Sequence, residues 1–145
     1  DPSRVGALLE TAHAVLAGLD PAAEMGFALA MGKLWGVHLN DQNGMKFDED
    51  KNFGAENLRS AFNQIKVLKE HNFCANGEYI GLDVKTMRTQ KMEDSFRHIE
   101  TSLKIAKAME EKVNRYDYAF AEECIKDRNY EKLECYVLEL IMGLK

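Results

Sequence analysis

Three short runs of apolar residues are spaced along the chain, at residues 5–9, 34–39 and 79–82. Each run is continuous and ends abruptly in polar residues, as in strands that helices cover on both faces. We therefore predict three buried β-strands, which are separated by longer stretches of mixed polarity.

Two amphipathic helices are predicted between these strands. Asp20-Pro21 is typical of a helix start, with an N-cap followed by proline at the first helical position, and the helix is expected to end near Gly32. A second helix follows Gly54, because its apolar residues recur at intervals of three and four on one face. Those residues are Leu58, Phe62, Ile65 and Leu68.

The last part of the chain is predicted to be helical throughout. A third helix is expected from about Lys91 to Val113. Beyond Tyr116 the helical pattern continues in two pieces, broken near residues 127–129, and this tail is expected to pack outside the main domain or against another subunit. The buried stripe of the third helix is predicted to consist of Met92, Phe96, Ile99, Leu103 and Ala106.

The order strand, helix, strand, helix, strand, helix predicts an α/β fold with parallel strands and right-handed crossovers. We expect residues 1–115 to form this domain and residues 116–145 to form the helical tail. In such folds the functional groups lie at the carboxyl ends of the strands. Six residues with metal-binding side chains lie at or after the carboxyl ends of these three strands: Glu10, His13, His38, Asp48, Asp50 and Asp83.

The segment after the second strand contains two of these acids. Asn43-Gly44 predicts a turn, since glycine accepts a positive φ. Asp48 and Asp50 follow, and in an extended segment two residues so spaced point the same way. Oxygen ligands suit Mg²⁺ or Mn²⁺, and an added imidazole suits Mn²⁺ or Co²⁺ equally well.

Each of these groups also has an ordinary interpretation. An acidic loop can be solvated, Glu10 and His13 can be surface residues, and a buried His38 is more often hydrogen-bonded than metal-bound. Together, however, converging carboxylates repel one another and raise their own pKa values. Only Lys85 and Arg88 lie near them in sequence, so the sequence favours one or two divalent cations.

Two further residues are candidate sugar-binding groups. Trp35 and Asn40 lie on or just after the second strand, next to the candidate metal ligands. Packing in the core is an equally good explanation for Trp35. The sequence therefore leaves the role of these two side chains open.

Composition and charge argue against some kinds of partner and indicate a cellular compartment. The net charge is −5 with a pI near 5.4, and the absence of a basic stripe argues against a nucleic-acid partner. No apolar run is long enough to cross a membrane. Three cysteines without paired spacing favour a reducing cytoplasm. The first residue is Asp1 instead of methionine, which fits a processed or truncated polypeptide.

The candidate ligands lie in motifs that resemble the xylose isomerase-like family of (β/α)₈ barrels. Glu10-Thr-Ala-His13 is similar to the Glu-x-x-His of the family's sixth strand. The segment from Leu39 to Asp50 resembles its loop after the seventh strand, Leu-Asn-x-Gln-Asn-Gly-x-Lys-Tyr-Asp-x-Asp. Leu82-Asp-Val-Lys85 with Arg88-Thr89 resembles the motif of the eighth strand.

This resemblance implies that the chain is the C-terminal part of a TIM barrel with a helical tail. It implies a two-metal site in which Glu10 bridges both ions and His13, Asp48 and Asp50 hold the catalytic one. His38 and Asp83 would then hold the other ion, with Lys85 just outside the ligands. The implied reaction is aldose–ketose isomerisation of a monosaccharide by a 1,2-hydride shift, with Mn²⁺, Mg²⁺ or Co²⁺ as cofactor.

The resemblance also has two departures. Xylose isomerases have Asp where this chain has His38, and a histidine there is typical of the rhamnose isomerase and ketose 3-epimerase branches. Strands one to five are absent, and with them the strand-five ligand, a catalytic lysine and the ring-opening histidine. We therefore expect the remainder of the barrel to come from the same polypeptide or another chain, and a homo-oligomer when complete.

Two alternatives to the isomerase remain open from the sequence. The first is a ketose 3-epimerase that uses one ion and proton transfer. The second is a half-barrel subunit or remnant without catalytic activity.

Overall fold

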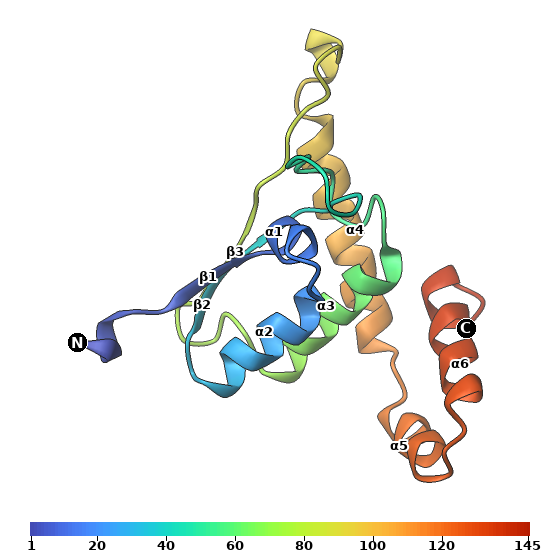
Figure 1. Ribbon diagram of the computed structural model, residues 1–145. Coiled ribbons are helices and arrows are strands. Elements are labelled where there is room, and N and C mark those ends of the chain that lie inside the picture. Colours follow the sequence, from blue (N-terminus) through green and yellow to red (C-terminus); the bar gives the residue numbers. More distant parts are fainter.

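A three-stranded parallel sheet lies at the centre of the fold, in the order β1-β2-β3. The computed structural model describes all 145 residues, and Figure 1 shows the helices gathered to one side of the sheet. The predicted α/β alternation with parallel strands is confirmed. The strands are β1 (Ala7–Glu10), β2 (Leu34–Leu39) and β3 (Tyr79–Leu82).

Six α-helices and two short 3₁₀ helices connect or follow the strands, and side-chain caps explain where most of the longer ones begin. The Asp20 carboxylate accepts a hydrogen bond from the Ala23 N–H, as predicted for this helix start, and Asn57 caps the next long helix in the same way. The helices are η1 (Pro2–Arg4), α1 (Thr11–Leu16), α2 (Pro21–Ala30), α3 (Leu58–Glu70), η2 (Met92–Asp94), α4 (Arg97–Asn114), α5 (Tyr118–Lys126) and α6 (Tyr130–Met142).

Strand register places the candidate ligands in one row across the sheet. Glu10 of β1 pairs with His38 of β2, and His38 pairs in turn with Gly81 of β3. Because side chains alternate along a strand, these residues share one face, and Val37 and Leu39 lie on the other. The sheet therefore presents its polar groups on the face away from the core.

The hydrophobic core lies between the opposite face of the sheet and the helices. Val37 and Leu39 are buried in a single cluster with Phe62 and Ile65 of α3 and Met25 of α2. These α3 residues are on the face that the spacing of apolar residues predicted. Leu58, the first residue of that predicted face, is instead 44% exposed, because it begins the helix beyond the edge of this cluster.

The N-terminal strand differs from its prediction. Val5 is exposed, and β1 begins at Ala7, whose N–H donates to the Lys33 carbonyl. The space beside Gly6 is taken by the Trp35 ring, which would overlap any Cβ added there. The strand extends to Glu10, and the short helix α1, which the sequence analysis did not predict, follows at once.

The third helix departs most from the sequence prediction. It begins at Arg97 instead of Lys91, and a separate 3₁₀ turn precedes it. Most of the predicted stripe faces away from the core, and Met92, Phe96 and Leu103 are 88%, 72% and 48% exposed. Ile99 is also exposed and Ala106 is half-buried. The buried residues of α4 are Ser102, Met109 and Val113, on the side that contacts α3.

The C-terminal tail forms two helices, α5 and α6, divided after Lys126 as predicted. Tyr136, Val137 and Leu140 of α6 join the hydrophobic core, where α6 contacts α3 and α4. Figure 1 shows the tail on the side of these helices that is remote from the sheet.

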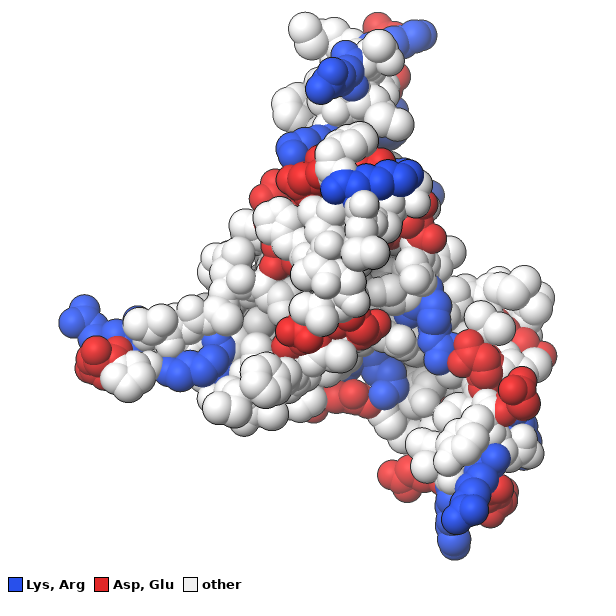
Figure 2. Space-filling model, viewed as in Figure 1, with Lys and Arg blue, Asp and Glu red and all other residues white.

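Figure 2 shows Lys and Arg mostly on the projecting parts of this face of the molecule. Asp and Glu lie both there and nearer its middle, around an area without charged side chains. None of the helices combines the length and the apolar character needed to cross a lipid bilayer. All three cysteines are free thiols; Cys124 is buried, and Cys74 and Cys135 are exposed.

Candidate metal centre

Glu10, His13 and Asp48 form the first group of converging side chains. The His13 Nε2 atom lies 3.4 Å from Glu10 Oε1 and 3.6 Å from Asp48 Oδ1. One potential ligand atom of each residue lies within 4.8 Å of the others. Glu10 ends β1 and His13 follows on the first turn of α1, so the strand-to-helix junction brings them together.

Glu10 also belongs to a second group, with His38 and Asp83. Their ligand atoms again lie within 4.8 Å of one another, and His38 Nδ1 is 3.5 Å from Asp83 Oδ2. His38 Nδ1 is buried and has no hydrogen-bond partner. A buried polar atom without a partner is unusual, and here it points towards two carboxylates.

Gly81 makes the position of the His38 ring possible. A Cβ atom added at Gly81 would lie 3.1 Å from His38 Cδ2, which is closer than most real Cβ contacts. The imidazole therefore lies against the backbone of β3, and Tyr79 contacts it edge to face with the ring centroids 6.4 Å apart.

Asp50 lies beside both groups but belongs to neither. Its carboxylate is buried, accepts a hydrogen bond from Asn40 Nδ2 at 3.0 Å and forms an ion pair with Lys85. The extended backbone predicted for Asp48 to Asp50 is wrong, because Asp50 has a φ of +44°. The antiparallel bridge between Asp41 and Lys51 turns the chain there, and the Asp50 carbonyl accepts from the Lys85 N–H.

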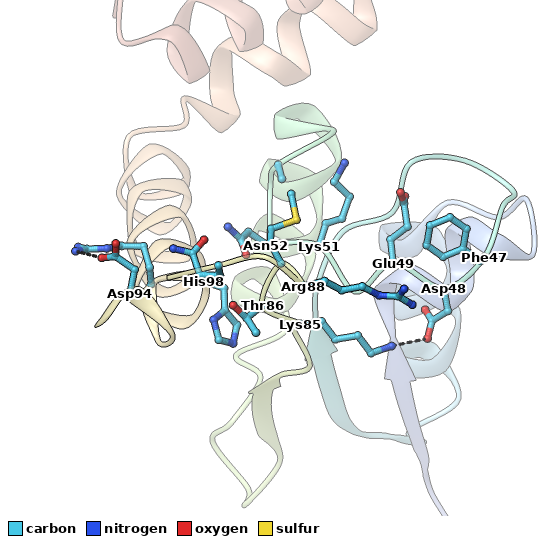
Figure 3. A pocket seen from close by; sticks show the side chains of 14 residues that line it. Phe47, Asp48, Glu49, Lys51, Asn52, Lys85, Thr86, Arg88, Asp94 and His98 are labelled. Carbon is cyan, nitrogen blue, oxygen red and sulfur yellow. Dashed lines mark hydrogen bonds and ion pairs between the residues drawn. The ribbon is translucent and has the colours of Figure 1, made fainter. Parts of the chain in front are cut away.

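Lys85 faces both acids of this loop. Its ammonium pairs with Asp50 and lies 3.4 Å from Asp48 Oδ2, as Figure 3 shows for Asp48. The hydrogen bond to Asp50 raises the pKa of Lys85. The pocket of about 550 Å³ beside these residues is lined mostly by polar and charged residues, which come from the loop after β2, the segment after β3 and the start of α4.

The two candidate sugar-binding residues lie in different places. Asn40 is 1% exposed and its side-chain amide is bonded to Glu10 and Asp50, so the structure brings it into the cluster. The Trp35 ring lies beside Gly6, before the start of β1, and Trp35 belongs to neither group of candidate ligands.

Two polar residues after Asn40 shape the acidic loop, and the sequence analysis did not identify their roles. Asp41 Oδ2 accepts hydrogen bonds from two backbone N–H groups, at residues 56 and 57, next to the start of α3. Gln42 donates to the carbonyls of Gly44 and Phe47 and accepts from the Glu49 N–H. The sequence feature that could have indicated these roles is the run of polar residues directly after a buried strand.

Burial and like charges act together on Glu10. Burial raises the pKa of the Glu10 carboxyl, and the carboxylates of Asp83 and Asp50 raise it further. The hydrogen bond from Asn40 and the charge of His13 act in the opposite direction and lower this pKa. The net effect is a raised pKa, as expected where acids converge.

This donor set fits a divalent cation. Carboxylate oxygens from Glu10, Asp48 and Asp83 with two imidazoles are ligands that Mn²⁺, Mg²⁺ or Co²⁺ accept. The unpartnered His38 Nδ1 gives an independent reason, since a cation between Glu10 and Asp83 would satisfy it. The arrangement can therefore hold one or two ions with Glu10 in common.

Part of the chain is similar in sequence to known xylose isomerases. It is 36% identical over 92 residues to xylose isomerase from Thermus thermophilus, 35% to that from Thermus caldophilus and 34% to that from Streptomyces lividans. The match covers 63% of this chain and 22–23% of each relative. No model of a protein family matches the chain.

The resemblance to xylose isomerases that the motifs predicted is thus confirmed over this segment. The chain spans about a quarter of the length of the relatives it matches. Its three parallel strands and helices are compatible with part of a barrel.

Proposed function

We propose that this chain forms the C-terminal part of a divalent-metal-dependent sugar isomerase that interconverts an aldose and a ketose. The convergence of ligand-type side chains from three successive strand ends is the observation that supports this function most strongly. Similarity to xylose isomerases adds the type of substrate, a monosaccharide. The remainder of a (β/α)₈ barrel would complete the sheet and supply the other catalytic groups.

The six ligand-type residues have different tasks in this proposal. Glu10, His13, Asp48 and Asp50 would hold one ion, and His38 and Asp83 would hold the other with Glu10 shared. Bound cations act as Lewis acids that polarise a carbonyl and stabilise a developing alkoxide.

The other residues of the chain keep this arrangement in place. Lys85 balances the charge of Asp48 and Asp50, and Gln42 fixes the loop that presents Asp48. The reaction itself is the transfer of a hydride between C1 and C2 of the open sugar.

Calorimetric titration with Mn²⁺ tests the proposal. We expect the wild-type protein to bind the ion, and Asp48→Asn and His13→Gln each to abolish binding at the group formed by Glu10, His13 and Asp48, because each removes one of its ligands. Glu49→Gln is the matched control, since it removes one negative charge from the same loop outside the cluster. Unchanged binding in both ligand variants would contradict a metal centre here.

One observation favours a second candidate, a ketose 3-epimerase with a single ion. Glu10, His38 and Asp83 converge by themselves, and His38 supplies the only buried imidazole nitrogen in the cluster without a partner. This enzyme would move a proton by means of carboxylates, whereas the isomerase would move a hydride. Reaction in deuterated water separates the two, because only the proton route incorporates solvent deuterium into the product.

A further inference from the structure

The side-chain amide of Asn40 joins two of the candidate ligands. Its Nδ2 atom donates to Glu10 Oε1 at 2.9 Å and to Asp50 Oδ1 at 3.0 Å. The same nitrogen lies 3.0 Å from the backbone carbonyl oxygen of Asp83. One amide group therefore connects the ends of β1 and β3 with the acidic loop, and it does so from a position that is 1% exposed.

The other end of the amide fixes which way it faces. Asn40 Oδ1 accepts a hydrogen bond from the Ala12 N–H at 2.7 Å and lies 2.9 Å from Thr11 Oγ1. A backbone N–H can only donate, so the oxygen must face α1. The NH₂ group then faces two carboxylates and a carbonyl, which can only accept, and the orientation is unambiguous.

An asparagine has a specific advantage at this position. Glu10 and Asp50 repel each other, and a neutral donor between them orients one oxygen of each without adding a charge. An aspartate of the same shape could still accept the hydrogen bond from the Ala12 N–H if one of its oxygens took the place of Asn40 Oδ1. Its other oxygen could not donate to Glu10 or Asp50. Glu10 belongs to both ligand groups, so its orientation affects both.

We propose that Asn40 is a positioning residue that orients Glu10 and Asp50 for cation binding and does not contact the sugar. This inference rests on the proposed metal-dependent function. Hydrogen-bond partners of metal ligands typically change metal affinity by about 10- to 100-fold when they are removed. Asn40 is bonded to two such residues, so its donor group is expected to matter at that scale.

Mn²⁺ titration of the Asn40→Asp variant, at the protein's natural length, tests the inference. We expect affinity about tenfold weaker or worse, together with an altered electron paramagnetic resonance spectrum of the bound Mn²⁺. Equal affinity and an identical spectrum in the variant would overturn the role of Asn40 while leaving the metal centre intact. A wild-type protein that binds no Mn²⁺ would overturn the proposed function and this inference with it.

Thr11→Val is the matched control for a purely structural role. The Thr11 hydroxyl bonds the backbone of Asn40 and lies beside its side-chain oxygen, which keeps the bond from the Ala12 N–H in this variant. Thr11→Val therefore disturbs the same junction without removing the donor to Glu10 and Asp50. We expect it to lower the unfolding temperature and leave Mn²⁺ affinity unchanged. If Asn40→Asp does not fold, Asn40→Ala takes its place, and an equal loss of affinity in Thr11→Val and the Asn40 variant would overturn the inference.

Discussion

At the scale of single residues, Glu10 is the side chain on which the candidate site depends. It faces His13, His38 and Asp83 within one cluster, and its side chain is only 13% exposed. Burial of a carboxyl among other acids favours its protonated form. In the proposed metal centre, a proton and a divalent cation would therefore compete for the same oxygen atoms.

The pKa of Glu10 in the metal-free protein can be measured by ¹³C NMR of the labelled carboxyl. We expect the pKa to lie above the ordinary 4.5, because burial is the largest influence on it. The free energy of unfolding of the metal-free protein then increases as the pH falls towards the pKa of Glu10 in the unfolded chain. This contribution is lost as the pH rises through the pKa of Glu10 in the folded protein. His13→Gln should raise the pKa of Glu10 further, since a lowering charge is lost, and an unchanged titration would contradict this electrostatic account.

The sequence indicated which candidate residues converge, but not the residues that hold them in place. Glu10, His13 and His38 could be selected because they lie at or near the carboxyl ends of apolar runs. The role of Asn40 was not, because it depends on contacts with residues 28–30 positions away in the sequence. The same applies to the left-handed backbone at Asp50, which lies next to the bridge between Asp41 and Lys51.

At the scale of elements, the boundaries of the strands and helices followed from local chemistry. β2 and β3 have the predicted bounds because polar residues or turn residues flank short apolar runs on both sides. The first turn of α1 escaped prediction, since six residues of helix give too short a pattern to separate from a loop. The glycines in the loops between helices and strands then determine how closely a loop can pack on its neighbours.

Gly54→Ala and Gly44→Ala separate two effects of glycine in this structure. Both residues have a positive φ, +74° and +68°, which costs about 1–2 kcal/mol for alanine. Only at Gly54 would the new Cβ meet a neighbour, Ile105 Cγ2 of α4 at 2.7 Å, and overpacking adds about 1–3 kcal/mol. Urea denaturation should therefore show the larger loss for Gly54→Ala, and equal losses would argue against close packing of the loop on α4.

At the scale of the whole molecule, the chain has a core on one side and uncovered apolar groups elsewhere. The apolar stripe predicted for α4 makes this helix amphipathic, but the pattern alone does not say which surface covers the stripe. In the structure this stripe faces outward, and Figure 1 shows the segment before α4 extending away from the body. In the proposed barrel, further units would cover this outward-facing surface and complete the fold.

Phe96→Gln and Phe62→Ala test this division between core and surface. Phe96 is 72% exposed, so we expect its replacement to change the free energy of unfolding by less than about 0.5 kcal/mol. Phe62 is 1% exposed in the main cluster, and its truncation should cost about 3–5 kcal/mol. Comparable losses in urea denaturation would mean that α4 buries Phe96 in solution.

The ion pairs of Lys85 affect how a cation would reach Asp48 and Asp50. In the proposed metal centre, a cation that reached Asp48 and Asp50 would find an ammonium already beside both carboxylates. Binding would then be an exchange of partners, in which the ion takes over the contacts of the Lys85 ammonium with these acids. Replacing Lys85 with methionine would remove that competitor and leave the two acids mutually repelled until the ion arrives.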